Sequence, residues 1–330
     1  MTVVDHAAAL GDHEFALCLT HDVDRPYKGL RGLYYALDER PGYHLKTVLS
    51  RDNPYWQFEE TMALEADLGV RSAWYFLDEP HILFDGSPAD WVDPEQWVQF
   101  LGRYDVTAPD IAAVIAALDR GGWEVGLHGS IPAHADRERL RVEKRRIERV
   151  LGHEVRGGRQ HYLRLDGERT WARQRALGLR YDASLGSGET YGFDHGYAPL
   201  RPFDDDFVVF PLTLMEQALP DPAGDDAWRA CEALLDEAAE NDAVMTVLWH
   251  PRYFNDREFP GYRRLYRRLV ERALEMGAWV GPPVDLYERL ADEGTLPTVS
   301  GSKSDDDRSA TGQNGRGGNG RSRNAGRRSG

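Results

Sequence analysis

Short apolar segments alternate with amphipathic helical patterns over about 280 residues, and this alternation restricts the fold more than any other feature of the chain. The predicted strands are residues 15–20, 72–77, 123–127, 155–159, 207–212 and 243–249. The predicted helices lie near residues 56–69, 109–120, 136–151, 169–177, 225–240 and 261–276. A helix between two strands is the usual crossover that lets those strands pair in parallel. The sequence therefore predicts an α/β fold, either a barrel or a doubly wound sheet.

Two stretches fall outside this alternation. Residues 27–55 fit neither periodicity, and we expect them to form an insertion over one end of the sheet. From residue 297 the composition changes to Gly, Ser, Asn and Arg without apolar periodicity, and such a segment buries too little surface to fold. We therefore predict one folded domain, residues 1–296, and a disordered tail, residues 297–330. Transient contact of the tail with RNA or with the acidic domain is the alternative interpretation.

The charge of the chain restricts its partners. The 330 residues carry a formal net charge of −15, and Lys stands at only four positions, so the basic charge comes almost wholly from Arg. A domain this acidic is not expected to bind nucleic acid or an anionic membrane surface. The acidic, Lys-poor composition resembles that of proteins from salt-loving organisms.

Hydropathy and cysteine content indicate the compartment. No apolar run reaches the length of a membrane helix, about 18 residues, and the first 15 residues lack the basic start and apolar centre of a secretory signal. A cytoplasmic protein is therefore expected. The two cysteines, Cys18 in a predicted strand and Cys231 in a predicted helix, are expected to be buried and free.

Ionisable residues gather just past the predicted strands. The segment FALCLTHDVDRP, residues 15–26, is the plainest case, because an apolar strand runs directly into three ionisable side chains. The carboxyl ends of parallel strands meet at one edge of the sheet, where α/β proteins hold their catalytic residues. We therefore expect a site at this edge. The residues that follow strands or short apolar segments are His21, Asp22, Asp24, His128, Arg159, His161, Tyr162, Asp182 and His250.

The residue types in this set indicate a metal. Carboxylates and imidazoles without thiolates suit Zn²⁺, or alternatively Fe²⁺, Co²⁺ or Mn²⁺. Asp22 and Asp24 stand one residue apart on an expected irregular turn, so they can point in different directions. One can bind the metal while the other accepts a proton from an attacking water. This division of roles is typical of a metal-dependent hydrolase.

The residues resemble the polysaccharide deacetylases, carbohydrate esterases of the chitooligosaccharide deacetylase type. The resemblance covers roughly residues 12–290 and rests on five motifs that occur in order, THDVD, LHGS, RQHYLR, YDAS and LWH. It implies a distorted (β/α) barrel of about seven parallel strands. It also implies a divalent metal, with zinc first among the candidates, and a carbohydrate substrate.

The resemblance assigns catalytic roles to four residues. Asp22 matches the general base and His250 the general acid. Arg159 matches the residue that orients the catalytic Asp, and Asp182 matches the partner that keeps the acid protonated. The implied reaction is hydrolysis of an N-acetyl group on an amino sugar.

The metal ligands depart from the family pattern. Asp24 and His128 match two ligands, but the second motif usually has another His four residues on, where this chain has Pro132. His161 stands where the third motif usually has Pro, so we expect His161 to be the third ligand. His134 is the alternative, and a weakened or absent metal site is the other.

Aromatic residues near the motifs are candidates for substrate contacts. Tyr162 matches a third-motif position that contributes backbone, and Trp249, Trp74 or Tyr253 can stack on sugar rings, although packing inside the barrel is the competing interpretation. Two other functions stay open: hydrolysis of a non-sugar amide bond, and a catalytically silent sugar-binding protein. A pure binding protein needs neither a base nor an acid, and this sequence retains both.

Overall fold

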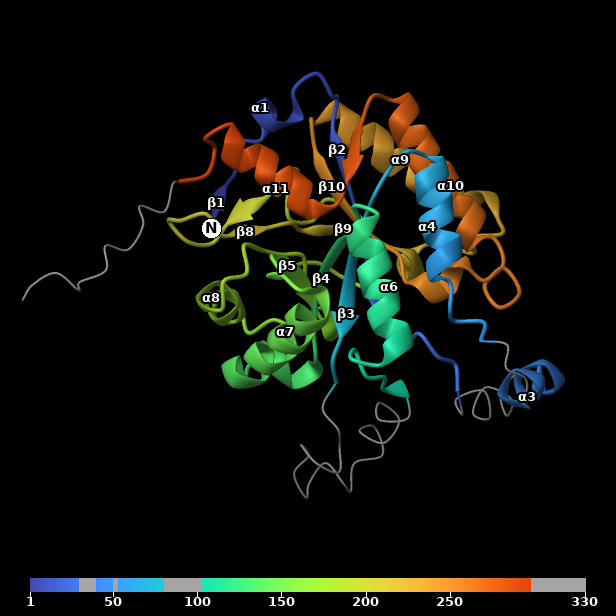
Figure 1. Cartoon of the computed structure of the whole chain (residues 1–330). Coiled ribbons are helices and arrows are strands. Elements are labelled where there is room, and N and C mark those ends of the chain that lie inside the picture. The colour runs from blue at the N-terminus through green and yellow to red at the C-terminus, as the bar shows by residue number, and fades with distance from the viewer. Residues whose placement is uncertain (30–39, 50–52, 80–101, 298–330) are drawn as a thin grey trace, which may run out of the picture. The chain divides into compact units, whose positions relative to one another are not determined.

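The computed structural model describes residues 1–29, 40–49, 53–79 and 102–297 (Figure 1). Residues Met1–Thr298 form one compact unit. The predicted tail lies outside the described residues except for its first residue, and the predicted insertion is described only in part.

Among the described residues, eight parallel strands form the main row of the sheet. Their order is β8-β6-β5-β4-β3-β2-β10-β9. Strands β8 and β9 follow one another in the chain, so residues 208–215 pair with β6 at one end of this row and with β10 at the other. The sheet therefore curls into a distorted barrel, which confirms the α/β prediction and excludes the doubly wound alternative. The bounds are β2 (Ala16–Val23), β3 (Ala73–Leu77), β4 (Glu124–Gly129), β5 (Gly157–Gln160), β6 (Tyr181–Asp182), β8 (Val208–Val209), β9 (Leu212–Met215) and β10 (Val244–Leu248).

Three further strands among the described residues extend this row, and β6 and most of β9 also lie outside the predicted strands. β1 (Thr2–Val3) pairs antiparallel with β7 (Leu200–Arg201), which pairs antiparallel with β8. β11 (Trp279–Gly281) pairs in parallel with residues 16–18 of β2, whereas β3 pairs with residues 20–23 of the same strand.

Helices lie outside the curled sheet (Figure 1). All six predicted helices are present, with ends shifted by a few residues, and α1, α3 and α11 are additional. No helix among the described residues is long and apolar enough to cross a membrane. The bounds are α1 (Ala7–Leu10), α3 (Pro41–Leu49), α4 (Phe58–Asp67), α6 (Pro109–Arg120), α7 (Arg137–Leu151), α8 (Glu168–Ala176), α9 (Asp225–Glu240), α10 (Tyr262–Glu275) and α11 (Pro283–Asp292).

Side chains of β2 alternate between the two faces of the sheet, as the pleat requires. Leu17 and Leu19 face outward into a core cluster shared with α9 and α10. Ala16 and Cys18 face inward, into a cluster with Tyr75 and other side chains of the barrel interior. Both cysteines are buried and free, as predicted. Because β2 runs on to Val23, this alternation also decides where the ionisable residues of the strand point.

Four parallel strands end in a short 3-10 turn. η2 (Ile131–His134) follows β4, η3 (His161–Leu163) follows β5, η4 (Glu216–Ala218) follows β9 and η5 (Pro251–Phe254) follows β10. Such a turn redirects the chain within three or four residues. The side chains at these junctions therefore stay close to the edge of the barrel.

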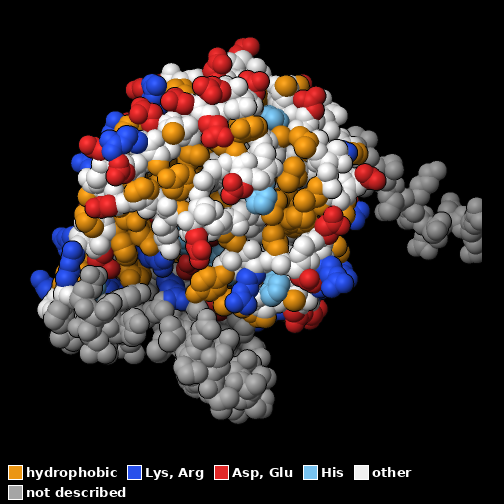
Figure 2. Space-filling view, turned by 180° about the vertical axis from the view of Figure 1, so that it is seen from behind, with side chains coloured by type: hydrophobic (Ala, Val, Ile, Leu, Met, Phe, Trp, Pro, Cys, Tyr) orange, Lys and Arg blue, Asp and Glu red, His pale blue; other side chains and the backbone are white. Residues whose placement is uncertain are grey.

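Charged side chains of both signs cover the surface. On the face that Figure 2 shows, Asp and Glu side chains lie over much of the upper part, and Lys and Arg side chains lie mostly toward the left and lower edges. Neither sign covers the whole face.

Candidate metal and catalytic site

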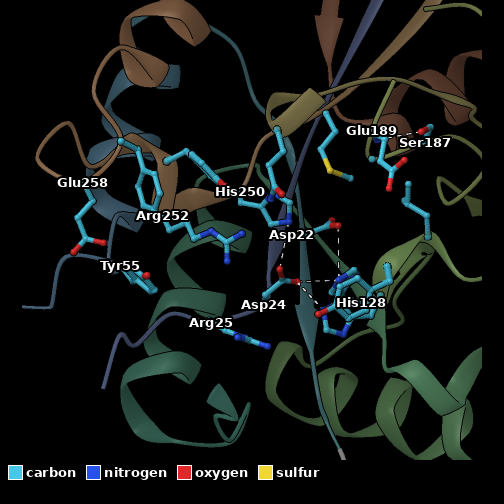
Figure 3. Close-up of a pocket in the computed structure, with 18 of the residues that line it drawn as sticks. Asp22, Asp24, Arg25, Tyr55, His128, Ser187, Glu189, His250, Arg252 and Glu258 are labelled. Carbon is cyan, nitrogen blue, oxygen red and sulfur yellow. Dashed lines mark hydrogen bonds and ion pairs between the residues drawn. The ribbon is translucent and has the colours of Figure 1, made fainter. Parts of the chain in front are cut away.

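A cavity of about 830 Å³ opens at the carboxyl ends of the strands (Figure 3). Six of the residues that the sequence placed after strands line it, whereas His21, Arg159 and Asp182 do not. Its lining is Asp22, Asp24, Arg25, Arg40, His44, Tyr55, His128, His161, Tyr162, Leu163, Gly186, Ser187, Gly188, Glu189, Met215, Gln217, His250, Arg252, Tyr253, Glu258 and Phe259.

Asp22 is held by a buried arginine. Asp22 lies on the inward face of β2, and its Oδ1 accepts a hydrogen bond from Arg159 Nη1 at 2.9 Å. The guanidinium is fixed in turn, because Nε donates to the Ala183 carbonyl at 2.7 Å and Nη1 to Thr20 Oγ1 at 2.9 Å. The expected contact between Arg159 and Asp22 is therefore present. It leaves Oδ2 of Asp22 facing His128 Nε2, 3.7 Å away.

Asp24, His128 and His161 come together at the base of the cavity. One ligand atom from each lies within 4.8 Å of the other two. Asp24 Oδ1 is 3.1 Å from His128 Nε2 and 3.8 Å from His161 Nε2. Tetrahedral zinc with bonds of about 2.1 Å separates its donor atoms by roughly 3.4 Å. The two distances from Asp24 Oδ1 lie on either side of this value, and the third is within 4.8 Å.

The hydrogen bonds of these residues also fit a metal. His128 Nδ1 donates to the Arg159 carbonyl at 3.0 Å, which leaves the lone pair on Nε2, the nitrogen that faces Asp24. Asp24 Oδ1 is buried without a hydrogen-bond partner. His161 Nδ1 lies 3.4 Å from the Glu79 carboxylate, a distance for an ion pair rather than a well-aligned hydrogen bond. A buried oxygen that lacks a donor is the kind of group that a cation satisfies.

The electrostatics agree with this geometry at Asp24. Burial opposes the charge of Asp24, but the cationic and hydrogen-bonding effect of His250, His128 and His161 holds its pKa well below the usual value. Burial likewise opposes the charged form of His128, and the carboxylates of Asp22 and Asp24 raise its pKa. The carboxylate form that metal binding needs is therefore favoured at Asp24.

His250 lies beside this group with a partner that the sequence did not reveal. Its Nδ1 donates to Glu216 Oε1 at 2.6 Å, and its Nε2 is 3.3 Å from Asp24 Oδ2. Burial opposes protonation, but Glu216 and Asp24 together raise the pKa of His250 to about 10. His250 is therefore protonated at neutral pH, as a general acid must be.

The predicted pairing of Asp182 with His250 is wrong. The Asp182 carboxylate is fully buried and accepts hydrogen bonds from Trp171 Nε1, Gln174 Nε2, and the amide and hydroxyl of Ser184. Because these donors use both carboxylate oxygens, Asp182 holds α8 against the strand ends. The partner of His250 is Glu216.

A longer strand prediction would have found Glu216. The predicted strand 207–212 ends too early, because the chain continues through Pro211 into β9, and Glu216 is the first residue after that strand. The mostly apolar residues 212–215 (LTLM) predict this extension, because they continue the strand up to Glu216. Glu216 then has the same place relative to its strand as the other ionisable residues of the site.

His21 belongs to the core rather than to the site. It lies inside β2 on the outward face, and its ring nitrogens bond to the Trp249 carbonyl at 2.5 Å and to Glu65 Oε1 at 2.8 Å. The prediction that the strand ends at residue 20 hid this, since a strand that continues to Val23 directs His21 and Asp22 to opposite faces.

The aromatic candidates divide into two groups. Tyr162 lines the cavity, is 58% exposed, and stacks on the His161 ring in a left-handed backbone conformation with φ of 56°. Tyr253 also lines the cavity. Trp249 and Trp74 are 0% exposed, and Trp249 packs against Tyr266 in the core. The prediction that Trp249 binds substrate is therefore wrong, because neither face of its ring is accessible.

His134 is directed away from the three-residue group. Its Nδ1 bonds to the Ile131 carbonyl at 2.6 Å within η2, and the group that could hold a metal contains His161 instead. Of the two alternatives for the third ligand, the geometry favours His161.

Solved structures show which fold this is. A crystal structure of a Mycobacterium smegmatis protein assigned as a polysaccharide deacetylase has a TM-score of 0.59 at 16% identity, over 92% of this chain and 98% of that one. The allantoinase PuuE has a TM-score of 0.56 at 15% identity, over 87% and 93%. A Pseudomonas aeruginosa protein assigned as a polysaccharide deacetylase has a TM-score of 0.52 at 14% identity, over 87% and 94%.

The likeness to these structures extends over nearly the whole folded part of the chain. No protein-family model and no curated protein matches the sequence. At such identities the likeness defines the fold, which is the polysaccharide deacetylase fold that the motifs implied.

Proposed function

We propose that this protein is a metal-dependent hydrolase that removes the N-acetyl group from an amino sugar. The observation that carries the proposal is the arrangement of a base and an acid around one three-residue group. Asp22, held by Arg159, faces His128 from one side, and His250, held by Glu216, faces Asp24 from another (Figure 3). The fold shared with two proteins assigned as polysaccharide deacetylases supports the choice of bond.

The metal is assigned to Asp24, His128 and His161. Carboxylate and imidazole donors suit Zn²⁺, with Fe²⁺, Co²⁺ and Mn²⁺ as alternatives. When bound, such a cation supplies the positive charge that polarises the acetamide carbonyl.

Asp22 and His250 carry out the two proton transfers. Asp22 accepts a proton from the attacking water, and its hydrogen bond to Arg159 fixes the direction of its free oxygen. His250 donates a proton to the leaving amine, and Glu216 keeps His250 in the protonated form that this step requires. Asp182 supports the site by holding α8 in place. Tyr162 supports it by stacking on the His161 ring.

Hydrolysis of a non-sugar amide is the second candidate function. The allantoinase PuuE shares this fold with a TM-score similar to that of the polysaccharide deacetylases, so the fold is compatible with that class of substrate. The reaction at the carbonyl would use the same base and acid.

The test is an assay of the metal-loaded protein. Protein loaded separately with Zn²⁺, Co²⁺, Mn²⁺ or Fe²⁺ is incubated with N-acetylated oligosaccharides, O-acetylated oligosaccharides and allantoin, and acetate and ureide products are measured. We expect acetate from the N-acetylated sugars and none with Asp22→Asn. Release of ureide products alone would support the second candidate, and metal-loaded protein that is inactive on every substrate would support a silent binding protein.

A further inference from the structure

Arg252 places a positive charge inside the cavity. It lies in η5, two residues after His250, and it is half-buried. Figure 3 shows its side chain extending from η5 toward the space beside Asp24 and His250. Burial opposes the charge, but Tyr253, Asp24 and Glu216 raise the pKa of Arg252, so the guanidinium is always charged. A group that reaches the reacting centre in this way will meet any substrate bound there.

No described carboxylate pairs with this guanidinium. Among the residues that the structure describes, Arg252 forms no side-chain hydrogen bond and no ion pair, and the centre of the Tyr253 ring lies 5.1 Å from its guanidinium carbon. Other arginines at half-buried positions are paired, such as Arg139 with Glu143 and Arg146 with Asp105. A partly desolvated charge without a partner costs free energy, and a ligand with the opposite charge offsets that cost.

The wall around Arg252 has the same sign. We call it the arginine wall: Arg25, Tyr55, Arg252, Tyr253 and Phe259. The Arg25 side chain lies over Gly102, where a Cβ would come within 2.9 Å of Arg25 Nε. Two guanidinium groups and two phenol rings therefore lie along this side of the cavity.

The neighbouring acid does not cancel this charge. Glu258 also lines the cavity, but its carboxylate is paired with the buried Lys28 ammonium. The opposite wall consists of Gly186, Ser187, Gly188 and Glu189, with no arginine. Arg252 and Arg25 therefore make the arginine wall favourable to an anionic group of a ligand.

We infer that the substrate carries a carboxylate on the same sugar as the acylated amine and that Arg252 binds it. The inference rests on the proposed function and specifies its substrate class as an acidic amino sugar rather than a neutral one. A guanidinium matches a carboxylate with two parallel hydrogen bonds, which explains an arginine here rather than a lysine. A phosphate presents similar oxygens, and the test separates the two anions.

The test uses sugars that differ at one carbon. The probes are the methyl glycosides of N-acetylglucosamine, of the same sugar with a carboxylate at C6, and of its 6-phosphate. Binding is measured by calorimetry on metal-loaded Asp22→Asn protein, in which turnover is blocked. Charge-assisted hydrogen bonds of this kind change affinity by roughly 10- to 100-fold. We expect the uronic acid to bind more tightly than the neutral sugar by this factor.

Variants then assign the preference to one residue. Arg252→Gln should abolish the preference for the acid, Arg252→Lys should keep part of it, and Arg169→Gln, which changes a side chain that is 80% exposed, should leave it intact. Tighter binding of the 6-phosphate than of the uronic acid would overturn the carboxylate assignment. If Asp22→Asn protein that retains Arg252 binds neutral and acidic sugars with equal affinity, the inference as a whole is overturned.

Kinetics distinguish this role from stabilisation of the transition state. If Arg252 acts on the acidic group, Arg252→Gln raises KM for the acidic sugar and leaves the neutral sugar unaffected. An equal loss of kcat on both sugars would overturn the inference and leave the proposed function intact. Binding of the uronic acid that depends on Arg252, without acetate release by the wild-type protein, would overturn the proposed function and leave the anion site intact.

Discussion

Strand β2 carries a buried cluster of imidazole and carboxylate groups on each of its two faces. The pocket cluster, on the inward face, consists of Asp22, Asp24, His128, His161 and His250. The core cluster, on the outward face, consists of His21, Glu65, Ser72, Trp123 and Tyr266. The two clusters share imidazole and carboxylate groups, and adjacent residues of one strand, His21 and Asp22, belong to different clusters.

The core cluster is saturated with hydrogen bonds. Glu65 Oε1 accepts from His21 at 2.8 Å and from Tyr266 at 2.5 Å, and Oε2 accepts from Ser72 at 2.8 Å and from Trp123 at 2.6 Å. Burial opposes the charge of Glu65, but His21 and these hydroxyl and indole donors lower its pKa. The carboxylate has no capacity left for a ligand, so its role is to hold α4, β2 and α10 together.

The pocket cluster keeps unused capacity. Asp24 Oδ1 and His161 Nδ1 are buried without hydrogen-bond partners, and both belong to residues that line the cavity. Unsatisfied groups at such a position cost stability, and a ligand that pairs with them offsets this cost. Saturation, rather than residue type, separates a structural cluster from a functional one.

The largest expected effect is on kcat and concerns the pocket cluster. Asp22→Asn should lower kcat by roughly 10²- to 10⁴-fold, because the amide cannot accept the proton from water. The Asn oxygen can still accept the hydrogen bond from Arg159, so the metal should stay bound. Acetate release and metal content are measured on the same sample. Full activity in this variant would contradict the assignment of Asp22 as the base.

The next effect is on stability and concerns the core cluster. Glu65→Ala removes the acceptor of four buried donors and should lower the free energy of unfolding by about 3–5 kcal/mol. Urea unfolding gives this value, and kcat per folded molecule should stay near that of the wild type. A loss of activity without a loss of stability would show that the core cluster acts in catalysis.

Metal affinity tests the ligand set in the pocket cluster. Asp24→Ala, His128→Ala and His161→Ala should each weaken metal binding by more than about 100-fold, since loss of a group that only hydrogen-bonds to a ligand already costs roughly 10- to 100-fold. His134→Ala is the matched control, because His134 is bonded to its own turn. Metal content after gel filtration is the measurement. Retention of metal by His161→Ala and loss by His134→Ala would reverse the assignment of the third ligand.

Much of the fold could be predicted from the sequence because its long elements are strongly periodic. Strands such as β3 and β10 and helices such as α6 and α9 are apolar or amphipathic over enough residues to show their period. Strands β6 and β7 have two residues each, which is too few for any period to be visible. Their pairing depends on the curvature of the whole sheet.

The site could be predicted as far as the strand ends were placed correctly. Asp24, His161 and His250 follow strands, His128 lies near the end of β4, and the structure brings the four together. The prediction for Trp249 is wrong, and the sequence contained the reason. Adjacent side chains of an extended chain point to opposite faces, so Trp249 and His250 are not expected to face the same cavity. The partner of His250 could not be chosen between Asp182 and Glu216 without knowing how β8 and β9 close the barrel.

The smallest expected effect is on the pH dependence of stability and concerns Glu124, a buried carboxylate outside both clusters. Glu124 is 9% exposed and accepts from Tyr181 Oη and from the Val284 amide, with Asp285 and Arg156 also near, so it has fewer donors than Glu65 and no imidazole. Burial raises the pKa of Glu124 to about 8 from an ordinary value of 4.5. A carboxyl whose pKa is raised in the folded state binds a proton there that the unfolded state has released, so stability falls as pH rises between these values.

Glu124→Gln removes this titration. Relative to the variant, the wild type should lose stability by about 1.4 kcal/mol per pH unit between roughly pH 5.5 and pH 7. Urea unfolding of both proteins at several pH values gives the slope. For Glu65 the sign is opposite, because its lowered pKa makes it stabilising above its ordinary pKa and the stabilisation is lost as pH falls. Equal slopes for Glu124→Gln and the wild type would show that the hydrogen bonds from Tyr181 and Val284 compensate for burial, and that saturation needs only two donors.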